Sequence, residues 1–485
     1  MHGTISGTVA FDVPNWESLE RVIQGHVALP GSPTFDASPR PFNARFQDVE
    51  PKAIVSCENP QDVAETLSFA GGHDLEIVAR SGGHSFAGHS STRGVVIDVT
   101  PMRSVSVSGG VATVGAGARL GELYERLQEH GLAIPAGTCP EVGVAGLTLG
   151  GGLGILGRTY GVTSDSLVGA EIVLADGRIL ECDAQHDEDL FWALRGAGAG
   201  TFGVLTSLVF RTVPAPNATN VHLAWPLSRA SEVIEAWQSW APDGPDELAA
   251  SLKVTATGDV DRSPSVDVYG ALLGTESDAS GLFEEFVARA GSDPVSSLLE
   301  HLSFSETRRF WAELGEADQD KSEGGANQDE SEDGEPSGPM CLFVKSEFFR
   351  RSLPSRAITD LLELFSHGRV PGQSRELDFM PWGGAYNRVD PDATAFVHRE
   401  ERFQLKHAVT IAADASGSER EASQRQVDRW WGTVHPWGSA RVFQNFTDPD
   451  LDRWSDAYYG PHVDRLLQVK ARYDPANLFR LDQSS

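Results

Sequence analysis

The stretch of sequence that decides the fold runs from residue 137 to residue 161 and reads GTCPEVGVAGLTLGGGLGILGRTYG. Six of its glycines fall within residues 143–154, just after Cys139. Because glycine has no Cβ, the backbone of such a run can approach a phosphate or a flat ring closely. The run is not a Rossmann fingerprint, which needs G-x-G-x-x-G between a strand and a helix, with an acidic residue later in the sequence. It predicts a loop for a dinucleotide, with a glycine-rich crossover packed on a sheet as the alternative.

A second glycine-rich loop, RSGGHSFAG at residues 80–88, directly follows the apolar run 75–79. Its glycines and serines can turn backbone N–H groups toward a pyrophosphate. His84 at its centre is a nucleophile toward an electrophilic ring methyl group. We therefore expect His84 and Cys139 together to hold a flavin through two protein bonds. Each also has a plainer interpretation, His84 as the cap of a tight turn and Cys139 as a small buried hydrophobe.

Composition narrows the class of protein. With 485 residues, 40 % of them hydrophobic, the chain is long enough for two or three domains. The formal net charge of −30 disfavours nucleic acid and anionic membranes as partners. No run of 18 apolar residues predicts a membrane span, and the first residues, MHGTISG, lack the pattern of a signal peptide, which indicates a cytoplasmic protein. The scattered cysteines 57, 139, 182 and 341 predict neither a metal site nor a disulfide framework.

Hydrophobic periodicity predicts an α+β fold, and the sequence pattern changes near residue 217, after which the glycine-rich loops end. Before it we expect strands near 53–55, 76–79, 95–99, 111–114 and 203–213, helices at 59–70, 120–129 and 189–194, and a hairpin at Asp176-Gly177. After it we expect strands at 252–257, 266–273, 342–348, 394–397 and 403–411, and helices at 281–290, 355–366 and 418–431. This second pattern indicates an antiparallel sheet covered by helices. The acidic segment Glu316 to Gly338 predicts a solvated insertion.

Four segments, in this order, resemble the berberine-bridge-enzyme-like branch of the vanillyl-alcohol-oxidase flavoprotein superfamily. They are the two loops quoted above, DLFWALRGAGAGTFGV at 189–204 and YYGPHVDRLLQVKARYDPANLF at 458–479. The resemblance implies an FAD-binding domain made of residues 1–213 and 448–485, and a substrate domain, 214–447, whose antiparallel sheet roofs the flavin. It also implies that His84 is bonded to the 8α-methyl carbon of FAD and Cys139 to C6 of its ring.

The resemblance implies further cofactor-binding residues, most of them in the same loops. They are Arg80, Ser81, Gly82, Gly83, Ser85, Gly88, His89, Ser90, Gly137, Thr138, Val142, Gly143, Gly146, Leu147, Gly152, Leu153, Gly154, Tyr160, Gly161, Asp165, Gly203, Val204, Tyr458 and Asn477. Val142 matches the position that controls oxygen entry. A valine there is typical of an oxidase, although a simple packing role is the alternative.

The chain departs from the family pattern at the catalytic base. Members often carry Asn-Tyr where this chain has Asn445-Phe446, and phenylalanine cannot take a proton. A base must reach the proton with a suitable pKa. The remaining candidate catalytic residues are Tyr386, His398, His407 and Gln404. An amine or an activated phenol as substrate would need no strong base.

The sequence therefore predicts an FAD-dependent oxidase of a small organic molecule, in a natural-product tailoring step. Hydride would pass to flavin N5, and O2 would return as H2O2. Oxidation of an oligosaccharide at C1 is the nearest alternative. A flavin dehydrogenase with a quinone or protein acceptor, and a non-catalytic flavin-binding protein, belong to other classes that stay open.

Overall fold

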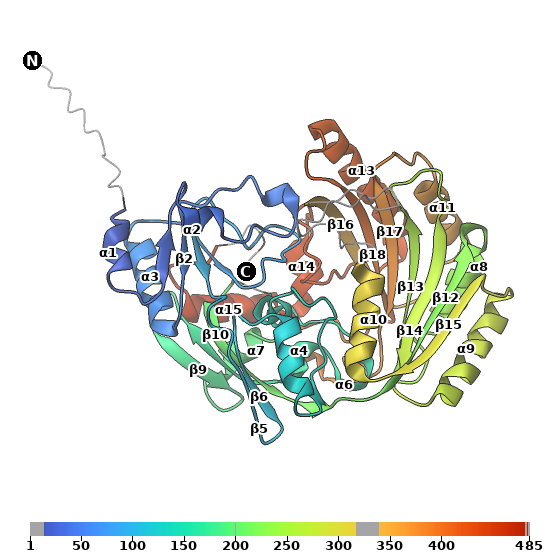
Figure 1. Cartoon of the computed structure of the whole chain (residues 1–485), viewed down its shortest axis with the longest axis horizontal. Coiled ribbons are helices and arrows are strands. Elements are labelled where there is room, and N and C mark those ends of the chain that lie inside the picture. The colour runs from blue at the N-terminus through green and yellow to red at the C-terminus, as the bar shows by residue number, and fades with distance from the viewer. Residues whose placement is uncertain (1–13, 199, 317–338, 481–482, 484–485) are drawn as a thin grey trace, which may run out of the picture.

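The computed structural model describes residues 14–198, 200–316, 339–480 and 483. The molecule has two parts, each built on its own β-sheet structure (Figure 1). The first part begins with the sheet order β1-β2-β4-β3, formed by β1 (His26–Ala28), β2 (Ala53–Ser56), β3 (Ile77–Arg80) and β4 (Val95–Asp98). Strands β2, β4 and β3 run parallel. Because β3 ends at Arg80, the loop with His84 starts at the carboxyl end of a parallel strand, where ligands commonly bind.

Helix α3 (Pro60–Gly72) makes the crossover from β2 to β3. It begins as its sequence predicts, because the side chain of Asn59 accepts the backbone N–H of Asp62 and Pro60 occupies the first turn. The short helices α1 (Trp16–Glu20) and α2 (Pro33–Asp36) precede it. The first sheet is thus assembled from local signals that the sequence carries openly.

The second sheet of the first part is antiparallel, in the order β5-β6-β10-β8-β9. Its strands are β5 (Val105–Ser108), β6 (Val111–Gly115), β8 (Leu167–Val173), β9 (Ile179–Asp183) and β10 (Val204–Arg211), and β7 (Leu132–Ala133) pairs separately with β11 (Val213–Pro214). The helices are α4 (Leu120–Gln128), α5 (Val144–Leu149), α6 (Gly157–Tyr160) and α7 (Glu188–Ala193). The expected hairpin joins β8 to β9, and Gly177 supplies its positive φ of 82°.

The second part is built on a seven-stranded antiparallel sheet in the order β15-β12-β14-β13-β17-β18-β16. Its strands are β12 (Ala218–Pro226), β13 (Leu248–Ala256), β14 (Ser265–Leu272), β15 (Ser296–Leu302), β16 (Met340–Phe349), β17 (Ser374–Pro381) and β18 (Phe403–Ala412). Helices α8 (Ala230–Gln238), α9 (Glu276–Ala290), α11 (Ser355–Ser366) and α13 (Gly417–Val434) pack on one face and bury a hydrophobic core there. In Figure 1 the opposite face of the sheet looks toward the first part.

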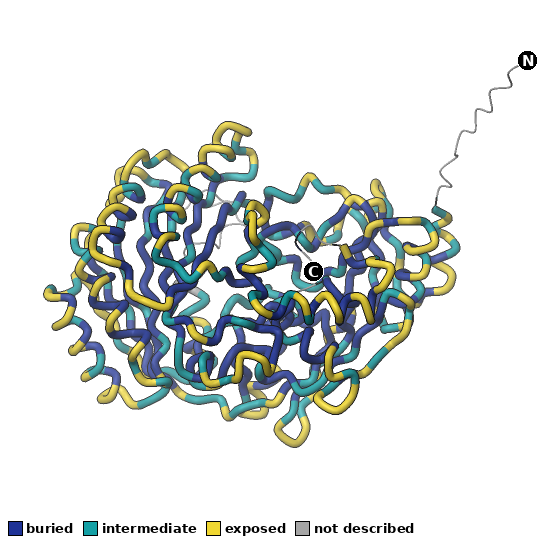
Figure 2. Tube along the Cα trace, turned by 180° about the vertical axis from the view of Figure 1, so that it is seen from behind, coloured by how far each residue is buried: buried dark blue, intermediate teal, exposed yellow. Residues whose placement is uncertain are grey.

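The end of the chain returns to the first part (Figure 1). Helices α14 (Trp454–Tyr459) and α15 (Val463–Tyr473) contribute Leu466, Val469 and Tyr473 to the core of the first part. That core otherwise draws mainly on residues 19–210, whereas the second core draws mainly on residues 221–434 (Figure 2 shows the buried stretches). The α+β fold class is confirmed, while the boundaries at 213 and 447 stay predictions.

The structure corrects parts of the secondary-structure prediction. Residues 394–397 are not a strand, because Ala395 and Phe396 donate their backbone N–H groups to the carbonyls of Trp192, near the end of α7, and Arg195, just after it. Strands β12, β15 and β17 were not predicted. Apart from Glu316, which ends α10 (Phe304–Glu316), the acidic insertion lies outside the described residues. The short helix α12 (Ala385–Arg388) lies between β17 and β18. None of the described helices is long and apolar enough to cross a membrane.

Candidate functional site

A cavity of about 440 Å³ lies where the two parts meet. The loop after β3, the loop before α5 and the turn after α7 line it from the first part. Strands β17 and β18 line it from the second part with Met380 and Lys406, and residues 443–447 close it from the returning chain. Segments far apart in the sequence thus share one cavity.

The cavity gathers most of the residues predicted to bind the cofactor. Those that line it are Arg80, Ser81, Gly82, Gly83, His84, Ser85, His89, Ser90, Gly137, Thr138, Cys139, Val142, Gly143, Gly146, Leu147, Leu153, Gly203 and Tyr458. The two nucleophiles that sequence singled out, His84 and Cys139, therefore face the same space. His84 stacks on Phe42 with ring centroids 4.7 Å apart.

The environment of His84 keeps its imidazole reactive. Burial, aided by the nearby Arg119 cation, lowers the pKa of His84 to about 4. The ring is therefore neutral near pH 7 and retains the nitrogen lone pair that a covalent bond to an electrophilic carbon requires. Cys139 is half-buried and forms no disulfide.

The two glycine-rich loops touch through their backbones. A Cβ on Gly82 would lie 2.3 Å from the backbone nitrogen of Gly143, and a Cβ on Gly143 would lie 2.4 Å from the nitrogen of Gly82. Only glycine at both positions allows this approach, since real Cβ atoms do not come so close to backbone. The contact fixes the loop of His84 against the loop of Cys139.

Arg80 adds a buried cation to this end of the cavity. Its Nη2 finds no hydrogen-bond partner among the described residues, although the side chain is only 4 % exposed. A guanidinium stays charged in proteins, and a buried charged donor without a partner is costly. A bound anion such as a pyrophosphate would satisfy it. The glycine cradle, the neutral histidine and this unpaired cation all fit FAD.

The remaining predicted cofactor residues lie outside the cavity lining and have other contacts. They are Gly88, Gly152, Gly154, Tyr160, Gly161, Asp165, Val204 and Asn477. Asp165 accepts hydrogen bonds from Arg399 at 2.6 and 2.9 Å. Val204 is buried in the first core, and a Cβ on Gly154 would meet the Ala136 carbonyl oxygen at 1.8 Å. In these places the family motif serves packing between segments.

None of the four candidate bases lines the cavity. Tyr386 stacks on Trp382 at 4.2 Å and donates its hydroxyl to the carbonyl of Gly154 at 3.4 Å, and burial raises its pKa above the usual range. His398 contacts Gln444 at 3.1 Å. Burial lowers the pKa of His398 to about 3, so this ring is neutral and held in a packed environment.

His407 and Gln404 lie on opposite faces of β18. His407 shares the helix-covered face with Leu405, and burial lowers its pKa to about 3. Gln404 is on the other face, fully buried, and neither amide atom has a hydrogen-bond partner among the described residues. An amide cannot act as a base, so Gln404 offers hydrogen bonds only.

The sequence prediction missed a charged group on the cavity side of the sheet. Register places Asp267, Lys253, Asp378 and Lys406 in one row across β14, β13, β17 and β18, with charges that alternate in sign. Lys406 Nζ lies 2.7 Å from Glu376 and 3.4 Å from Asp378. Of this group Lys406 alone is among the residues that line the cavity.

Opposite charges keep Glu376 and Lys406 ionised. Burial would raise the pKa of Glu376, but Lys253 and Lys406 lower it to about 2. Burial would lower the pKa of Lys406, but Glu376 and Asp378 raise it above its usual range. Lys406 is therefore an ammonium ion at neutral pH. Burial raises the pKa of Asp378, which also accepts a hydrogen bond from Tyr269 at 3.2 Å.

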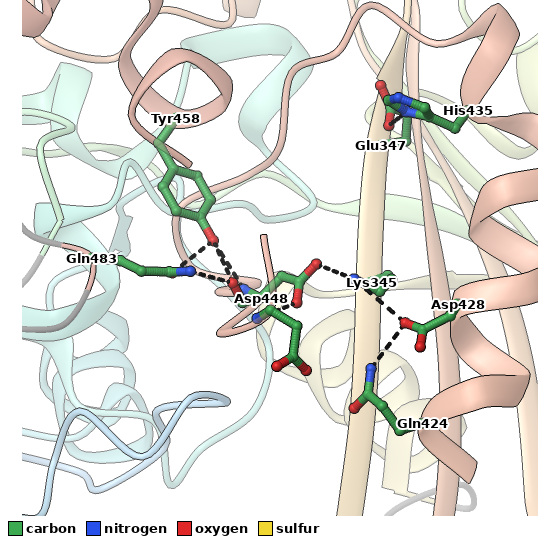
Figure 3. Close-up of polar contacts among 9 residues, drawn as sticks. Lys345, Glu347, Gln424, Asp428, His435, Asp448, Tyr458 and Gln483 are labelled. Atoms are coloured by element: carbon green, nitrogen blue, oxygen red, sulfur yellow. Dashed lines mark hydrogen bonds and ion pairs between the residues drawn. The ribbon is translucent and has the colours of Figure 1, made fainter. Parts of the chain in front are cut away.

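Polar contacts at Asp448 hold residues 443–447 in place (Figure 3). In the sequence this segment stands out only because Phe446 replaces the usual tyrosine. Lys345 on β16 donates to Asp448 at 2.6 Å, and both side chains are buried. The Tyr458 hydroxyl accepts the backbone N–H of Asp448 at 2.9 Å, and Gln483 donates to its carbonyl oxygen at 2.7 Å. The segment is thereby fixed to both parts of the molecule.

Comparison with known proteins gives two family matches. The family described as FAD binding domain matches residues 51–183, and the family described as berberine and berberine like matches residues 442–484. A Bacillus subtilis protein described as an uncharacterised FAD-linked oxidoreductase, YgaK, is 31 % identical over 95 % of this chain and 97 % of its own length. Chitooligosaccharide oxidase of Gibberella zeae is 30 % identical, over 94 % of this chain and 91 % of its own.

Solved structures share the whole fold. The structure of BBE-like 1 from Physcomitrella patens is 26 % identical and superimposes with a TM-score of 0.83, covering 97 % of this chain and 98 % of that chain. The match includes both parts of the molecule and therefore the interface that holds the cavity.

Proposed function

The chain belongs to the berberine-bridge-enzyme-like family of FAD-linked oxidoreductases, and from this premise we propose that it is an oxidase of a small organic molecule. FAD is the cofactor, and it supplies a two-electron acceptor for hydride when bound. The proposed setting is the tailoring of a natural product. The observation that carries the proposal is that His84, Cys139 and Val142 line one cavity together with a largely apolar wall.

Two protein bonds to the flavin form the first element of the proposal. His84 is a neutral nucleophile, and Cys139 faces the same cavity from the touching loop. Arg80 would pair with the pyrophosphate, because its Nη2 needs a partner. Attachment at two points would fix the ring so that substrate meets the face below β17 and β18.

Molecular oxygen is the proposed final acceptor. Val142 follows Cys139 in the same turn, where its backbone N–H donates to the Cys139 carbonyl at 3.4 Å, and its side chain lines the cavity. A branched side chain of this modest size leaves more room beside the ring than isoleucine or leucine would. A dehydrogenase that uses a quinone or a protein as acceptor is the competing outcome.

The described lining of the cavity offers the substrate no carboxylate base. Among the described residues that line the cavity there is no Asp or Glu. Tyr459 also lines it but donates its hydroxyl to the Ala197 carbonyl at 2.8 Å, and burial raises its pKa above the usual range. A substrate that is already activated, such as an amine or an acidic phenol, fits this site.

Aromatic walls favour a flat substrate. Phe86 stacks on Phe446 with centroids 5.5 Å apart, and Phe443 meets Phe446 edge to face at 5.2 Å. Oxidation of an oligosaccharide at C1 is the second candidate function. The similarity to chitooligosaccharide oxidase supports it.

A substrate screen under single-turnover conditions tests the proposal. Purified holoenzyme is mixed anaerobically with phenols, aromatic amines and chitooligosaccharides while flavin bleaching is followed, and air is then admitted while H2O2 is measured. Bleaching by an aromatic compound followed by stoichiometric H2O2 supports the proposal. Bleaching only by oligosaccharides supports the second candidate, and slow reoxidation in air would point to a dehydrogenase.

A further inference from the structure

The protein is strongly acidic, but the polar groups that line its largely apolar cavity are cations and neutral hydrogen-bonding groups. The formal net charge is −30, yet no Asp or Glu is among the described lining residues. Arg80 and Lys406 line it as permanent cations. A cavity with this charge pattern attracts an anion, because fixed charges within a low-dielectric wall are screened little by solvent.

The two cations lie on opposite sides of the cavity. Arg80 ends β3 in the first part, and Lys406 projects from β18 in the second part. Lys406 is 5.5 Å from the ring centroid of Phe446. Phe446 stacks on Phe86, which lies 6.5 Å from Phe42, the ring that stacks on His84. Three aromatic rings thus connect Lys406 to His84, the residue expected to hold the flavin ring.

Two carboxylates on the neighbouring strand β17 hold the ammonium of Lys406 in place. Glu376 and Asp378 on β17 contact Nζ at 2.7 and 3.4 Å, and Lys253 contacts Glu376 at 3.4 Å from the far side. The four side chains are between 8 and 13 % exposed. A lysine has a flexible stem, so paired carboxylates behind it restrict where its charge can go.

We propose that Lys406 is the substrate-recognition residue and that it binds an anionic oxygen carried on a conjugated ring, such as a phenolate, an enolate or a carboxylate. The ring of that ligand packs against Phe446 and Phe86. Glu376 and Asp378 are positioning residues, which orient the ammonium without touching the ligand. The proposal rests on the proposed function and narrows its substrate class.

The chemistry of the site agrees with such a ligand. Phe446 stands where family members often carry a tyrosine and cannot take a proton, and the cavity lining has no carboxylate in the part of the chain that the structure describes. A substrate that binds as the anion has already lost its proton to solvent. Pairing with an ammonium favours that anionic form by lowering the pKa of the bound hydroxyl. One residue would thus both select the substrate and remove the need for a base.

Ligand binding to the oxidised holoenzyme tests the proposal without turnover. Benzoate and its neutral counterpart benzamide are titrated at pH 7.5, and the shift of the visible flavin absorption gives each Kd. We expect benzoate to bind wild-type protein at least tenfold more tightly than benzamide. Lys406→Met should weaken benzoate about 10- to 100-fold, the loss of a charge-assisted hydrogen bond, and change benzamide less than threefold.

Controls separate recognition from folding. Lys52→Met removes an exposed lysine and should leave both Kd values unchanged. Lys406→Arg keeps the charge and should retain most of the preference for benzoate. If Lys406→Met fails to fold because Glu376 and Asp378 lose the cation that they share, the arginine variant and the benzoate–benzamide comparison on wild-type protein still decide.

Two results would overturn the proposal. One is that wild-type holoenzyme binds benzoate and benzamide with the same Kd, or binds neither compound. The other is a Lys406→Met variant that binds benzoate normally but has a changed flavin reduction potential, which would assign the ammonium to the cofactor. Failure of the substrate screen alone would instead count against the oxidase function, because benzoate binding needs no turnover.

Discussion

Asp165→Asn should destabilise the protein and leave flavin attachment intact. Both carboxylate oxygens of Asp165 accept from Arg399, at 2.6 Å from Nη2 and 2.9 Å from Nη1, and one also accepts the backbone N–H of Val162 at 3.0 Å. The Arg399 side chain is completely buried and that of Asp165 is 7 % exposed. This bidentate pair joins the first part to the loop before β18.

The expected cost follows from the charge that is left behind. An asparagine has one acceptor oxygen and would turn its amide donors toward the guanidinium, so Arg399 becomes a buried cation without a counter-ion. Breaking one partner of a buried pair costs about 3–5 kcal/mol. The unfolding entropy is about 2.1 cal/mol/K per residue, so for 485 residues unfolding as one unit the melting temperature should fall by about 3–5 °C.

Thermal unfolding followed by circular dichroism measures the effect, with flavin content measured after acid precipitation. Asp176→Asn is the matched control, because Asp176 pairs with Arg178 at 2.7 Å on the surface and both side chains are more than half exposed. Such a pair contributes at most about 1 kcal/mol. Loss of flavin from Asp165→Asn at an unchanged melting temperature would refute the reasoning and assign Asp165 to the cofactor.

Four further predictions concern the cavity and its surroundings. Acid-precipitated wild-type protein should stay yellow. His84→Ala and Cys139→Ala should each keep one link to FAD, and the double variant should release it. Free FAD from the denatured wild type would contradict two-point attachment. Val142→Ile should slow reoxidation of the reduced enzyme in air while sparing reduction by substrate, and identical stopped-flow traces would mean that oxygen enters elsewhere. Tyr386→Phe should change the rate of flavin reduction less than threefold, because the hydroxyl faces a backbone carbonyl outside the cavity; a loss of about 10²–10⁴ would restore Tyr386 as the base. The pKa of His407 is about 3 in the folded protein and near 6.5 in the unfolded chain, so the unfolded chain takes up a proton as the pH falls below 6.5 and the folded state loses stability. His407→Leu should therefore flatten the decline in melting temperature between pH 7 and pH 5. A decline as steep as that of the wild type would show that His407 titrates normally.

The cofactor site was predictable because its signals are local. The loops at 80–88 and 137–161 need glycine where backbones touch, as at Gly82 and Gly143, and such needs are written in consecutive residues. The helix start at Asn59 and the hairpin at Gly177 were predictable for the same reason. Asp165, four residues beyond the second loop, pairs with Arg399 in the structure, and its predicted contact with the cofactor stays a prediction.

Strand β17 was missed because its polar face is covered. Residues 374–381 read SRELDFMP, with charges at Arg375, Glu376 and Asp378 that obscure the alternation of a half-buried strand. In the structure Leu377 and Phe379 face the helices, whereas Glu376 and Asp378 face the first part of the molecule, where Lys253 and Lys406 neutralise them. A sequence pattern cannot distinguish a charged face in water from one that is buried against opposite charges.

The sequence by itself determined the α+β class, the two nucleophiles, the glycine loops and the loss of the usual tyrosine at Phe446, because each depends on residue type and short-range spacing. Only the tertiary structure decided which polar groups reach the cavity. It placed Tyr386, His398 and His407 in packed surroundings and brought Lys406 to the cavity wall. The physical reason is that register across four antiparallel strands sets the charges of Asp267, Lys253, Asp378 and Lys406 side by side, although Lys253 and Asp378 are 125 residues apart in the sequence.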